Sequence, residues 1–537
     1  MELWFKKELN KADEYLNSKG FRYSDLRELY YKKIDFKNKN IDFRIKIPIK
    51  YPLIYPEFYL DDKSLYLTFP HIEKYEAGIG SSICYLEDTK KVPYLDGLDV
   101  IASALDRVEK IIKDYSLDIF DKKDFMNEFD SYWSKKTIYF LDLYEDDDMP
   151  KIHKITKCPS IFKNIITNNI EQTKEKLNTL GLKHDTFQSI IYLPFNTQLE
   201  SIPYKYGQIM KLIEKHDYTE FFQQNFSLKN ISQYIYFSFL INDTKHFASC
   251  KIDKRLCKNN YVIPKFSLDY NVERAVVKRI DRERIFLRGG NKTTSYISRS
   301  SIKIAIIGCG SLGGSLALKL AKSGIRNFTF IDYDDLDINN IARHICPMKY
   351  LNKNKVEALQ YTILEHFPDC NIDIHHCNAT NCLDVLDNQN LIISALGSDG
   401  TIFETFLLQI YEHIPKIISW FEGSIGGHAI FIRRKIKNFS DIIGKLKIVD
   451  NSKEKELIKD DIGCNSAYAP YAFIDAENTV TAIARMVTNF IIKKEDFIDQ
   501  AWTMLGDLEE NHGLISEKYY EKDSYSILKR DFNGNKL

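Results

Sequence analysis

The sequence predicts a multidomain α/β chain, on three observations. Its length of 537 residues is enough for about three domains. Residues 301–355 follow the order strand, glycine turn, helix and strand that is typical of a βαβ unit. Residues 1–120 combine terminal helices with alternating apolar and polar residues, which is typical of an α+β domain. We therefore expect separate N-terminal and C-terminal domains with a mixed region between them.

The βαβ unit is predicted to bind a nucleotide. The apolar run 302–307 has the length and β-branched content of a buried parallel strand. The turn after it holds three glycines in a G-x-G-x-x-G pattern: Gly308, Gly310 and Gly313. Such glycines let the backbone approach a phosphate, which the next helix N-terminus attracts. A second apolar run, 328–331, ends in Asp332, where an acidic residue reaches a ribose hydroxyl. This combination indicates a Rossmann-like fold.

The residues after Asp332 indicate which nucleotide chemistry to expect. Asn340, Arg343 and Lys355 follow an aspartate-rich turn. An amide, a guanidinium and an ammonium suit a triphosphate, because cations stabilise charge on phosphoryl oxygens. The alternative is a solvated surface helix with ordinary lysines and arginines. An NAD oxidoreductase is poorly supported, since it needs one acid and then little else nearby.

The same segment carries a family resemblance. FIDYDDLDINNIARH resembles the D-x-D…N-L-x-R-Q segment of the ubiquitin-activating and ThiF/MoeB-type adenylating enzymes, and Lys355 stands where their phosphate lysine falls. LIISALGSDG resembles the strand that ends in their magnesium-binding aspartate, here Asp399. The resemblance implies ATP and Mg²⁺ as cofactors and a protein C-terminal carboxylate as the substrate. It also implies a homodimer, with Arg282 or Arg284 entering the partner subunit's nucleotide site.

Composition limits the function classes. Lys+Arg and Asp+Glu both number 75, so no global field favours nucleic acid or a membrane. We find no run of 18 apolar residues, and the charged start MELWFKKELNKADEYL is unlike a signal peptide, so we expect a cytoplasmic protein. Ten cysteines without C-x-x-C pairs fit a reducing cytosol better than a disulfide framework. The structural zinc of the ThiF/MoeB branch is accordingly not expected.

Residues 1–120 resemble a ubiquitin-conjugating domain. We expect helices over 3–19 and 97–115, with half-buried strands within 41–69 between them. The segment PHIEKY…GIGSSICYL corresponds to the active-site loop of that family and places its thioester cysteine at Cys84. The alternative is a small buried hydrophobe, but a Gly/Ser loop favours an accessible thiol. His71 is followed by isoleucine and not by the family's Pro-Asn, so the oxyanion donor is unassigned.

Residues 121–275 are expected to form a linker and a middle docking domain. Strands are predicted over 188–195, 233–243 and 245–253, and a helix over 166–180. The aspartate run 146–148 is predicted to be solvated. No motif in this region indicates a catalytic or binding function. Three residues could be proposed as metal ligands, but a structural role is expected for them: His216, His246 and Cys250.

Residues 276–537 are expected to form the adenylation domain with a second reactive cysteine. Two strands flank the glycine-rich stretch 423–427, and a long helix begins near Asp475. Cys464 precedes that helix, whose dipole raises the thiolate fraction. In ubiquitin-activating enzymes a mobile cysteine takes the adenylated tail as a thioester, and Cys464 matches it by position. Four other cysteines look less suitable for this role: Cys309, Cys346, Cys377 and Cys382.

The two halves together resemble the fused bacterial activating-conjugating enzymes of CBASS antiviral operons. In that family the cargo is the C-terminus of a cGAS-like nucleotidyltransferase, which implies adenylation, capture by Cys464, transfer to Cys84 and then to an amine. A ThiF/MoeB-like adenylase for sulfur transfer and a non-catalytic nucleotide-binding scaffold stay open. The sequence leaves open the cargo, the acceptor amine, the role of 151–275, and whether transfer occurs within a chain or across a dimer.

Overall fold

The computed structural model forms two compact units, residues 1–168 with 185–278 and residues 169–184 with 279–537. The structure describes these residues: 2–66, 68–73, 75–85, 96–120, 124–133, 138–145, 147–159, 162–199, 201–226, 232–253, 272–280, 284–286, 301–397, 401–434, 436, 439–459 and 468–531.

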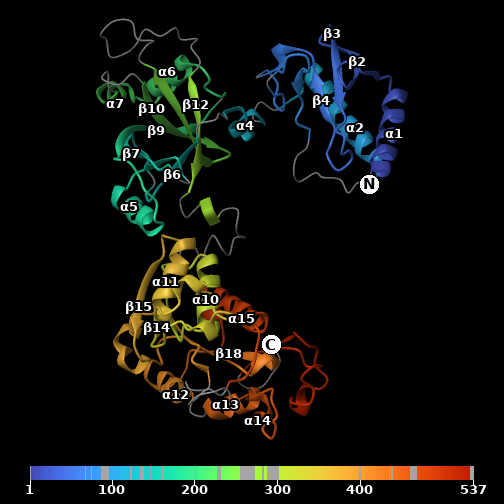
Figure 1. Ribbon diagram of the computed structural model, residues 1–537. Helices are drawn as coiled ribbons and strands as arrows, with labels where there is room; N and C mark the ends of the chain where they lie inside the picture. Colours follow the sequence, from blue (N-terminus) through green and yellow to red (C-terminus); the bar gives the residue numbers. More distant parts are fainter. Residues whose placement is uncertain are drawn as a thin grey trace. The chain divides into compact units, whose positions relative to one another are not determined.

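The first unit begins with an antiparallel five-stranded meander and two helices, drawn in blue in Figure 1. The strands and helices are β1 (Arg22–Ser24), β2 (Leu29–Phe36), β3 (Lys39–Lys46), β4 (Glu57–Leu60), β5 (Ser81–Ser82), α1 (Glu2–Ser18) and α2 (Gly97–Ser116). The Asp96 carboxylate caps α2 by accepting the N–H groups of Leu98 and Asp99 at 2.9 and 3.1 Å. Apolar residues of α1, α2 and the strands share one buried core. Both predicted helices are confirmed.

The remainder of the first unit is a closed barrel of seven strands in the order β10-β11-β12-β6-β8-β7-β9. The strands are β6 (Ile138–Asp142), β7 (Lys151–Lys157), β8 (Asn164–Thr167), β9 (Gln188–Gln198), β10 (Ser232–Ile241), β11 (Thr244–Asp253) and β12 (Glu273–Arg279). The helices are α3 (Asp124–Asn127), α4 (Phe129–Trp133), α6 (Tyr206–Lys215) and α7 (Thr219–Asn225). The three predicted strands are confirmed as β9, β10 and β11.

The strands of the barrel are buried on both faces. On β9, Leu193 and Phe195 belong to the core shared with α4, α6 and α7. The alternate residues Ile190 and Tyr192 belong to a second core that contains no helical residue. Trp133 joins α4 to the barrel, because its indole N–H donates to the carbonyls of Ser249 and Ala275 at 3.3 and 3.0 Å.

The prediction of a solvated aspartate run at 146–148 is wrong for Asp147. Its side chain is buried, with a carboxylate oxygen 2.9 Å from His153 Nε2 and an ion pair with Lys151. The charged partner Lys151 compensates its burial, which cannot be inferred from a run of aspartates in the sequence. Asp148 is exposed and pairs with Lys245 at 3.2 Å. Asp146 lies outside the described residues.

The second unit contains an eight-stranded sheet in the order β15-β14-β13-β16-β17-β18-β19-β20. The strands are β13 (Lys303–Ile307), β14 (Asn327–Asp332), β15 (Asn371–His376), β16 (Leu391–Ser394), β17 (Lys416–Phe421), β18 (Gly426–Ile432), β19 (Gln500–Leu505) and β20 (Ile527–Asp531). The helices are α5 (Ile170–Thr179), α10 (Ser311–Lys322), α11 (Lys355–His366), α12 (Thr401–Ile410), α13 (Phe439–Leu446), α14 (Glu454–Leu457) and α15 (Phe473–Lys493). The first five strands of this sheet are parallel, and the pairs from β17 to β20 are antiparallel.

Helices cover both faces of this sheet (Figure 1). Ile304 and Ile306 of β13 pack in a core with α10, α11 and α15, whereas Ala305 and Ile307 pack with α12. Strand β13 is bonded to β14 on one side and to β16 on the other, so the strand order reverses there. Ligands bind at such reversals in open α/β sheets. Among the described residues, no helix is long and apolar enough to span a bilayer.

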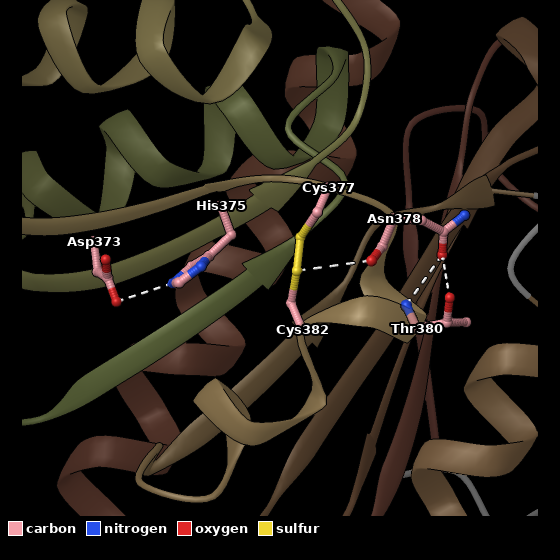
Figure 2. The surroundings of a disulfide bond; sticks show 6 residues. All are labelled: Asp373, His375, Cys377, Asn378, Thr380 and Cys382. Carbon is pink, nitrogen blue, oxygen red and sulfur yellow. Dashed lines mark hydrogen bonds and ion pairs between the residues drawn. A yellow bond between two sulfur atoms is a disulfide. The ribbon is translucent and has the colours of Figure 1, made fainter.

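The structure differs from the sequence expectation for two cysteines. Cys377 and Cys382 form a disulfide in the segment after β15, and Asn378, which follows Cys377 in the chain, lies to one side of the bond (Figure 2). The pairing is local, over a separation of five residues, and so does not amount to a disulfide framework. The other described cysteines are Cys84, which is exposed, and five that are buried: Cys158, Cys250, Cys309, Cys346 and Cys370.

Candidate functional site

A cavity of about 270 Å³ opens at the carboxyl ends of β13 and β16 in the second unit. Four residues predicted to contact nucleotide line it together: Gly310, Asn340, Arg343 and Lys355. The other lining residues are Ser311, Leu312, His344, Ala395, Leu396, Gly397, Ser419, Trp420, Phe421 and Tyr471. The cavity therefore lies where the order of the strands predicts a ligand.

The three predicted glycines have different surroundings. Gly308 has a φ of +85°, and a Cβ there would lie 2.7 Å from the carbonyl oxygen of Ala395. A Cβ on Gly313, in the first turn of α10, would strike the carbonyl oxygen of Gly308. Gly310 caps α10, and a Cβ there would meet no atom within 4 Å. Gly308 and Gly313 thus serve the packing of the loop, while Gly310 faces open space in the cavity.

Asp332 holds the glycine loop in place. One carboxylate oxygen accepts the N–H of Cys309 at 2.6 Å, and the other accepts the N–H of Asp334 at 2.9 Å. Asp332 is not among the residues that line the cavity. Its predicted contact with a ribose stays a prediction.

The cationic residues come from segments that follow β14. Lys355 is the first residue of α11, and its ammonium lies 2.6 Å from a carboxylate oxygen of Asp334. The Arg343 guanidinium lies over the ring of Tyr471, 4.8 Å from its centre. The side-chain oxygen of Asn340 accepts the N–H of Asp337 at 3.1 Å. Positive charge is thus concentrated beside the N-terminus of α10, which itself attracts anions.

Two further cavity residues were missed by sequence reasoning. The Tyr471 hydroxyl donates to Ser311 Oγ at 3.0 Å, which joins the start of α10 to the segment before α15. His344 Nε2 lies 2.7 Å from the carbonyl of Cys309, and its Nδ1 accepts the N–H of Cys346 at 3.1 Å. Burial lowers the pKa of His344, so the neutral tautomer donates from Nε2. His344 adjoins Arg343 in the motif, whereas no local signal identifies Tyr471.

The remaining predicted residues of the second unit are mostly outside the part of the chain that the structure describes. Asp399, Cys464 and Arg282 lie outside the described residues. Arg284 is described and exposed. Gly397, which lines the cavity, stands two residues before Asp399 in the chain.

The second predicted site lies in the first unit, at Cys84. Its thiol is exposed, as the Gly/Ser loop predicted. Ile72 and Ile83 form an antiparallel bridge, and the Cys84 N–H donates to the carbonyl of His71 at 2.8 Å. This register makes Cys84 and His71 direct cross-strand neighbours. Such neighbours have Cβ atoms about 4.5–5.5 Å apart on the same face.

A carboxylate contacts His71 from the other side. Glu128, between α3 and α4, places a carboxylate oxygen 2.6 Å from His71 Nδ1. Its second oxygen accepts the backbone N–H of His71 at 3.3 Å. The hydrogen bond with Cys84 and then that with Glu128 raise the pKa of His71 to about 10, against the opposing effect of burial. The His71 imidazole is therefore protonated at neutral pH.

Two family models match parts of the chain that hold these candidate sites. Residues 7–141 match the model of Prokaryotic E2 family B, and residues 282–460 match the model of the ThiF family. The chain joins an E2-like domain to a ThiF domain. The E2 match contains Cys84, His71 and Glu128, and the ThiF match contains every residue that lines the cavity except Tyr471.

Parts of the chain also resemble individual proteins. Ubiquitin-like modifier-activating enzyme 5 of Drosophila persimilis is 24% identical over 252 residues, which are 43% of this chain and 64% of that protein. A probable molybdopterin-synthase adenylyltransferase of Porphyra purpurea is 29% identical over 128 residues, 23% of this chain and 34% of that protein. The chain thus spans less than two thirds of these relatives.

Solved structures show a likeness of limited extent. E. coli MccB with ATP is 16% identical and has a TM-score of 0.29, covering 44% of this chain and 66% of that chain. PaaA is 17% identical and has a TM-score of 0.30, with the same two coverages.

Proposed function

We propose that this chain uses ATP to adenylate the C-terminal carboxylate of a protein, captures the acyl group as a thioester and transfers it to an amine. The carboxylate attacks the α-phosphate of ATP and releases pyrophosphate. Cys464 then attacks the acyl adenylate and releases AMP. The acyl group passes to Cys84 and finally to an amine of the target.

The cavity in the ThiF domain is the observation that carries the adenylation step. Lys355 and Arg343 supply positive charge for the phosphates, and Gly310 leaves room for a phosphate at the N-terminus of α10. Lys355 is paired with Asp334, so a phosphate would compete with that carboxylate for the ammonium. In this proposal Asp332 contacts the ribose and Asn340 a phosphate.

A magnesium ion is part of the proposal through Asp399. Carboxylate oxygens with phosphate oxygens are the ligands that Mg²⁺ prefers in nucleotide sites. Asp399 follows the cavity wall at Gly397 within two residues, which supports its assignment as the ligand. The ion supplies charge compensation between phosphate oxygens when bound.

Two cysteines carry the acyl transfer in this proposal. Cys84 is exposed within an E2-like domain, which supports its role as the second acyl carrier. Cys464 is assigned by its position before α15 and by the family resemblance. Thiolates are strong nucleophiles, so each transfer exchanges one thioester for another.

The proposed partners follow from the resemblance to fused activating-conjugating enzymes. The cargo is a ubiquitin-like protein or a cGAS-like nucleotidyltransferase with a free C-terminus, in an antiviral CBASS setting. We further propose a homodimer through the ThiF domain, in which Arg282 or Arg284 reaches the nucleotide site of the partner subunit. Neither a membrane nor nucleic acid is a proposed partner, and the proposed location is the cytoplasm.

A gel assay tests the relay. A protein encoded beside this chain, with a free C-terminus, is mixed with ATP and Mg²⁺, and the products are separated without reducing agent. We expect thiol-sensitive adducts with the wild type, none with Cys464→Ala, and a stalled adduct with Cys84→Ala. Cys158→Ala is the matched control, because that thiol is buried in the barrel.

A sulfur-transfer adenylase is the alternative, and the relative from Porphyra purpurea supports it. It predicts pyrophosphate release by all these variants without any protein adduct. That outcome would contradict the conjugation proposal while leaving the adenylation step intact.

A further inference from the structure

We propose that Cys84, His71 and Glu128 form a catalytic unit in which the His71 imidazolium holds the Cys84 thiolate and Glu128 holds the imidazolium. His71 is a catalytic residue in this unit because its side chain is hydrogen-bonded to the Cys84 thiol, and Glu128 is a positioning residue. The substrate class of the unit is a thioester. Its use in acyl transfer rests on the proposed function, whereas the unit itself requires neither ATP nor cargo.

The backbone of His71 is held in an uncommon conformation. Its φ is +58°, in the left-handed region, which is unfavourable for a non-glycine residue. Two hydrogen bonds hold the residue there, one from the Cys84 N–H to its carbonyl and one from its own N–H to Glu128. Such strain is concentrated at functional sites, where surrounding contacts fix the geometry. Here both contacts come from the other members of the unit.

The charges of the three groups alternate. Glu128 is the carboxylate that pairs with His71, whose side chain is 23% exposed. The titratable groups facing this pair from packed elements are Tyr115 of α2, Tyr132 of α4 and the Cys84 thiol. Burial raises the pKa of Tyr115 and of Tyr132, so both phenols are neutral. The carboxylate therefore acts on the imidazole without a competing phenolate.

Atoms and electrons balance in both steps of the acyl transfer. The Cys84 thiolate attacks the carbonyl carbon of the incoming thioester, a new C–S bond forms, and the donor sulfur leaves as a thiolate. In the second half an amine attacks the same carbon, and the C–S bond to Cys84 breaks. The electron pair returns to Cys84 Sγ beside the imidazolium, and the amine nitrogen loses its proton to water. The His71 proton stays on the ring throughout.

This assignment also gives a role to a departure from the family pattern. His71 has no Pro-Asn after it, so the asparagine that would stabilise an oxyanion is absent at that position. A cation beside the sulfur lowers the barrier differently, because it stabilises the thiolate as the leaving group. The unit accordingly acts on the sulfur and not on the carbonyl oxygen.

The pH dependence of Cys84 alkylation tests the unit. Iodoacetamide reacts with the thiolate, and mass spectrometry of the Cys84 peptide in the full chain gives the rate. We expect His71→Asn to react about 10-fold more slowly than the wild type at pH 7 and equally fast at pH 10. Asparagine tolerates a positive φ, so this variant keeps the backbone. Equal rates at pH 7 in folded protein would overturn the proposal.

Glu128 needs a readout of its own. In ¹⁵N-histidine-labelled chain, the His71 signal, identified by its loss in His71→Asn, should titrate near pH 10 in the wild type and at clearly lower pH in Glu128→Gln. Glu73→Gln is the matched control, because the Glu73 carboxylate accepts a hydrogen bond from the Ser82 hydroxyl in the same two-stranded segment. This variant should leave the His71 titration unchanged. An unchanged titration in Glu128→Gln would exclude Glu128 from the unit.

The two proposals can fail separately. If the alkylation profile shifts as expected but no cargo adduct forms, the proposed catalytic unit is supported and the proposed conjugation function is contradicted. If adducts form but Cys84 of His71→Asn is alkylated at the wild-type rate, the conjugation function is supported and the catalytic unit is contradicted.

Discussion

Two neighbouring glycines allow stability and nucleotide binding to be separated. Gly308 has a φ of +85°, and a Cβ there would lie 2.7 Å from Ala395 O in the cavity wall. Gly310 has a φ of −74°, and a Cβ there would meet no atom within 4 Å. We therefore expect Gly308→Ala to destabilise the second unit and Gly310→Ala to leave its stability unchanged.

The magnitude follows from two terms. A left-handed alanine costs about 1–2 kcal/mol, and forcing a methyl group into a packed site costs about 1–3 kcal/mol. Together they lower the free energy of unfolding by about 3 kcal/mol. A domain of this size loses about 2–4 °C in Tm per kcal/mol, so Gly308→Ala should melt about 6–12 °C lower.

Calorimetry of the full chain measures both properties. The transition that belongs to the ThiF domain is the one that ATP raises in the wild type, since a ligand stabilises the domain that binds it. Gly310→Ala should melt like the wild type without ATP, but bind ATP at least about 10-fold more weakly, because its methyl group stands where a phosphate approaches the helix N-terminus. Wild-type affinity in Gly310→Ala would refute that placement of the phosphate. An unchanged Tm in Gly308→Ala would refute the packing argument.

Three further predictions concern the same unit. Tyr471→Ala should weaken ATP binding about 3–10-fold by removing the ring that contacts Arg343, while Tyr471→Phe should keep most of the affinity in calorimetry. Lys355→Ala should slow pyrophosphate release at least about 100-fold in a coupled assay, unlike Lys353→Ala, whose ammonium pairs with a glutamate outside the cavity. Burial raises the pKa of Glu404 to about 7, so its carboxyl stabilises the fold below pH 4.5 and loses this effect as the pH rises towards 7. The stability gained by Glu404→Gln should therefore be about 2–3 kcal/mol larger at pH 8 than at pH 5, as measured by urea unfolding.

The parts of the fold that were predicted from sequence are those encoded by local patterns. The apolar run at 302–307 became β13, and the run at 328–331 became β14. The period of apolar residues in 97–115 gave α2 almost to the residue. In each case burial of one stripe or one strand depends on residues within the segment itself.

The barrel was not predicted, because its closure joins strands far apart in the chain. Strand β6 pairs with β8, and β10 pairs in parallel with β9. The burial of Asp147 depends on strand pairing, since its backbone carbonyl accepts the Tyr192 hydroxyl of β9 at 3.1 Å. Neither pairing nor burial can be inferred from the acidic run alone.

The candidate sites divide in the same way. Gly310, Arg343 and Lys355 belong to one continuous motif, so their meeting in the cavity followed from the resemblance. Tyr471 lies 160 residues beyond Ser311 in the chain, and no sequence motif predicts that it lines the cavity.

Cys84 was predicted from its loop, but the side chains around its sulfur were not. His71 becomes its neighbour through the backbone register of two short segments, and Glu128 reaches His71 from 57 residues further along the chain. A histidine without its usual Pro-Asn looks like a degraded motif when only the sequence is considered. The position of Glu128 gives a different reason for the substitution, because a carboxylate that keeps the imidazole protonated makes the ring a partner for the sulfur. A conjugating-type site can therefore lack the asparagine and still stabilise the charge that transfer creates.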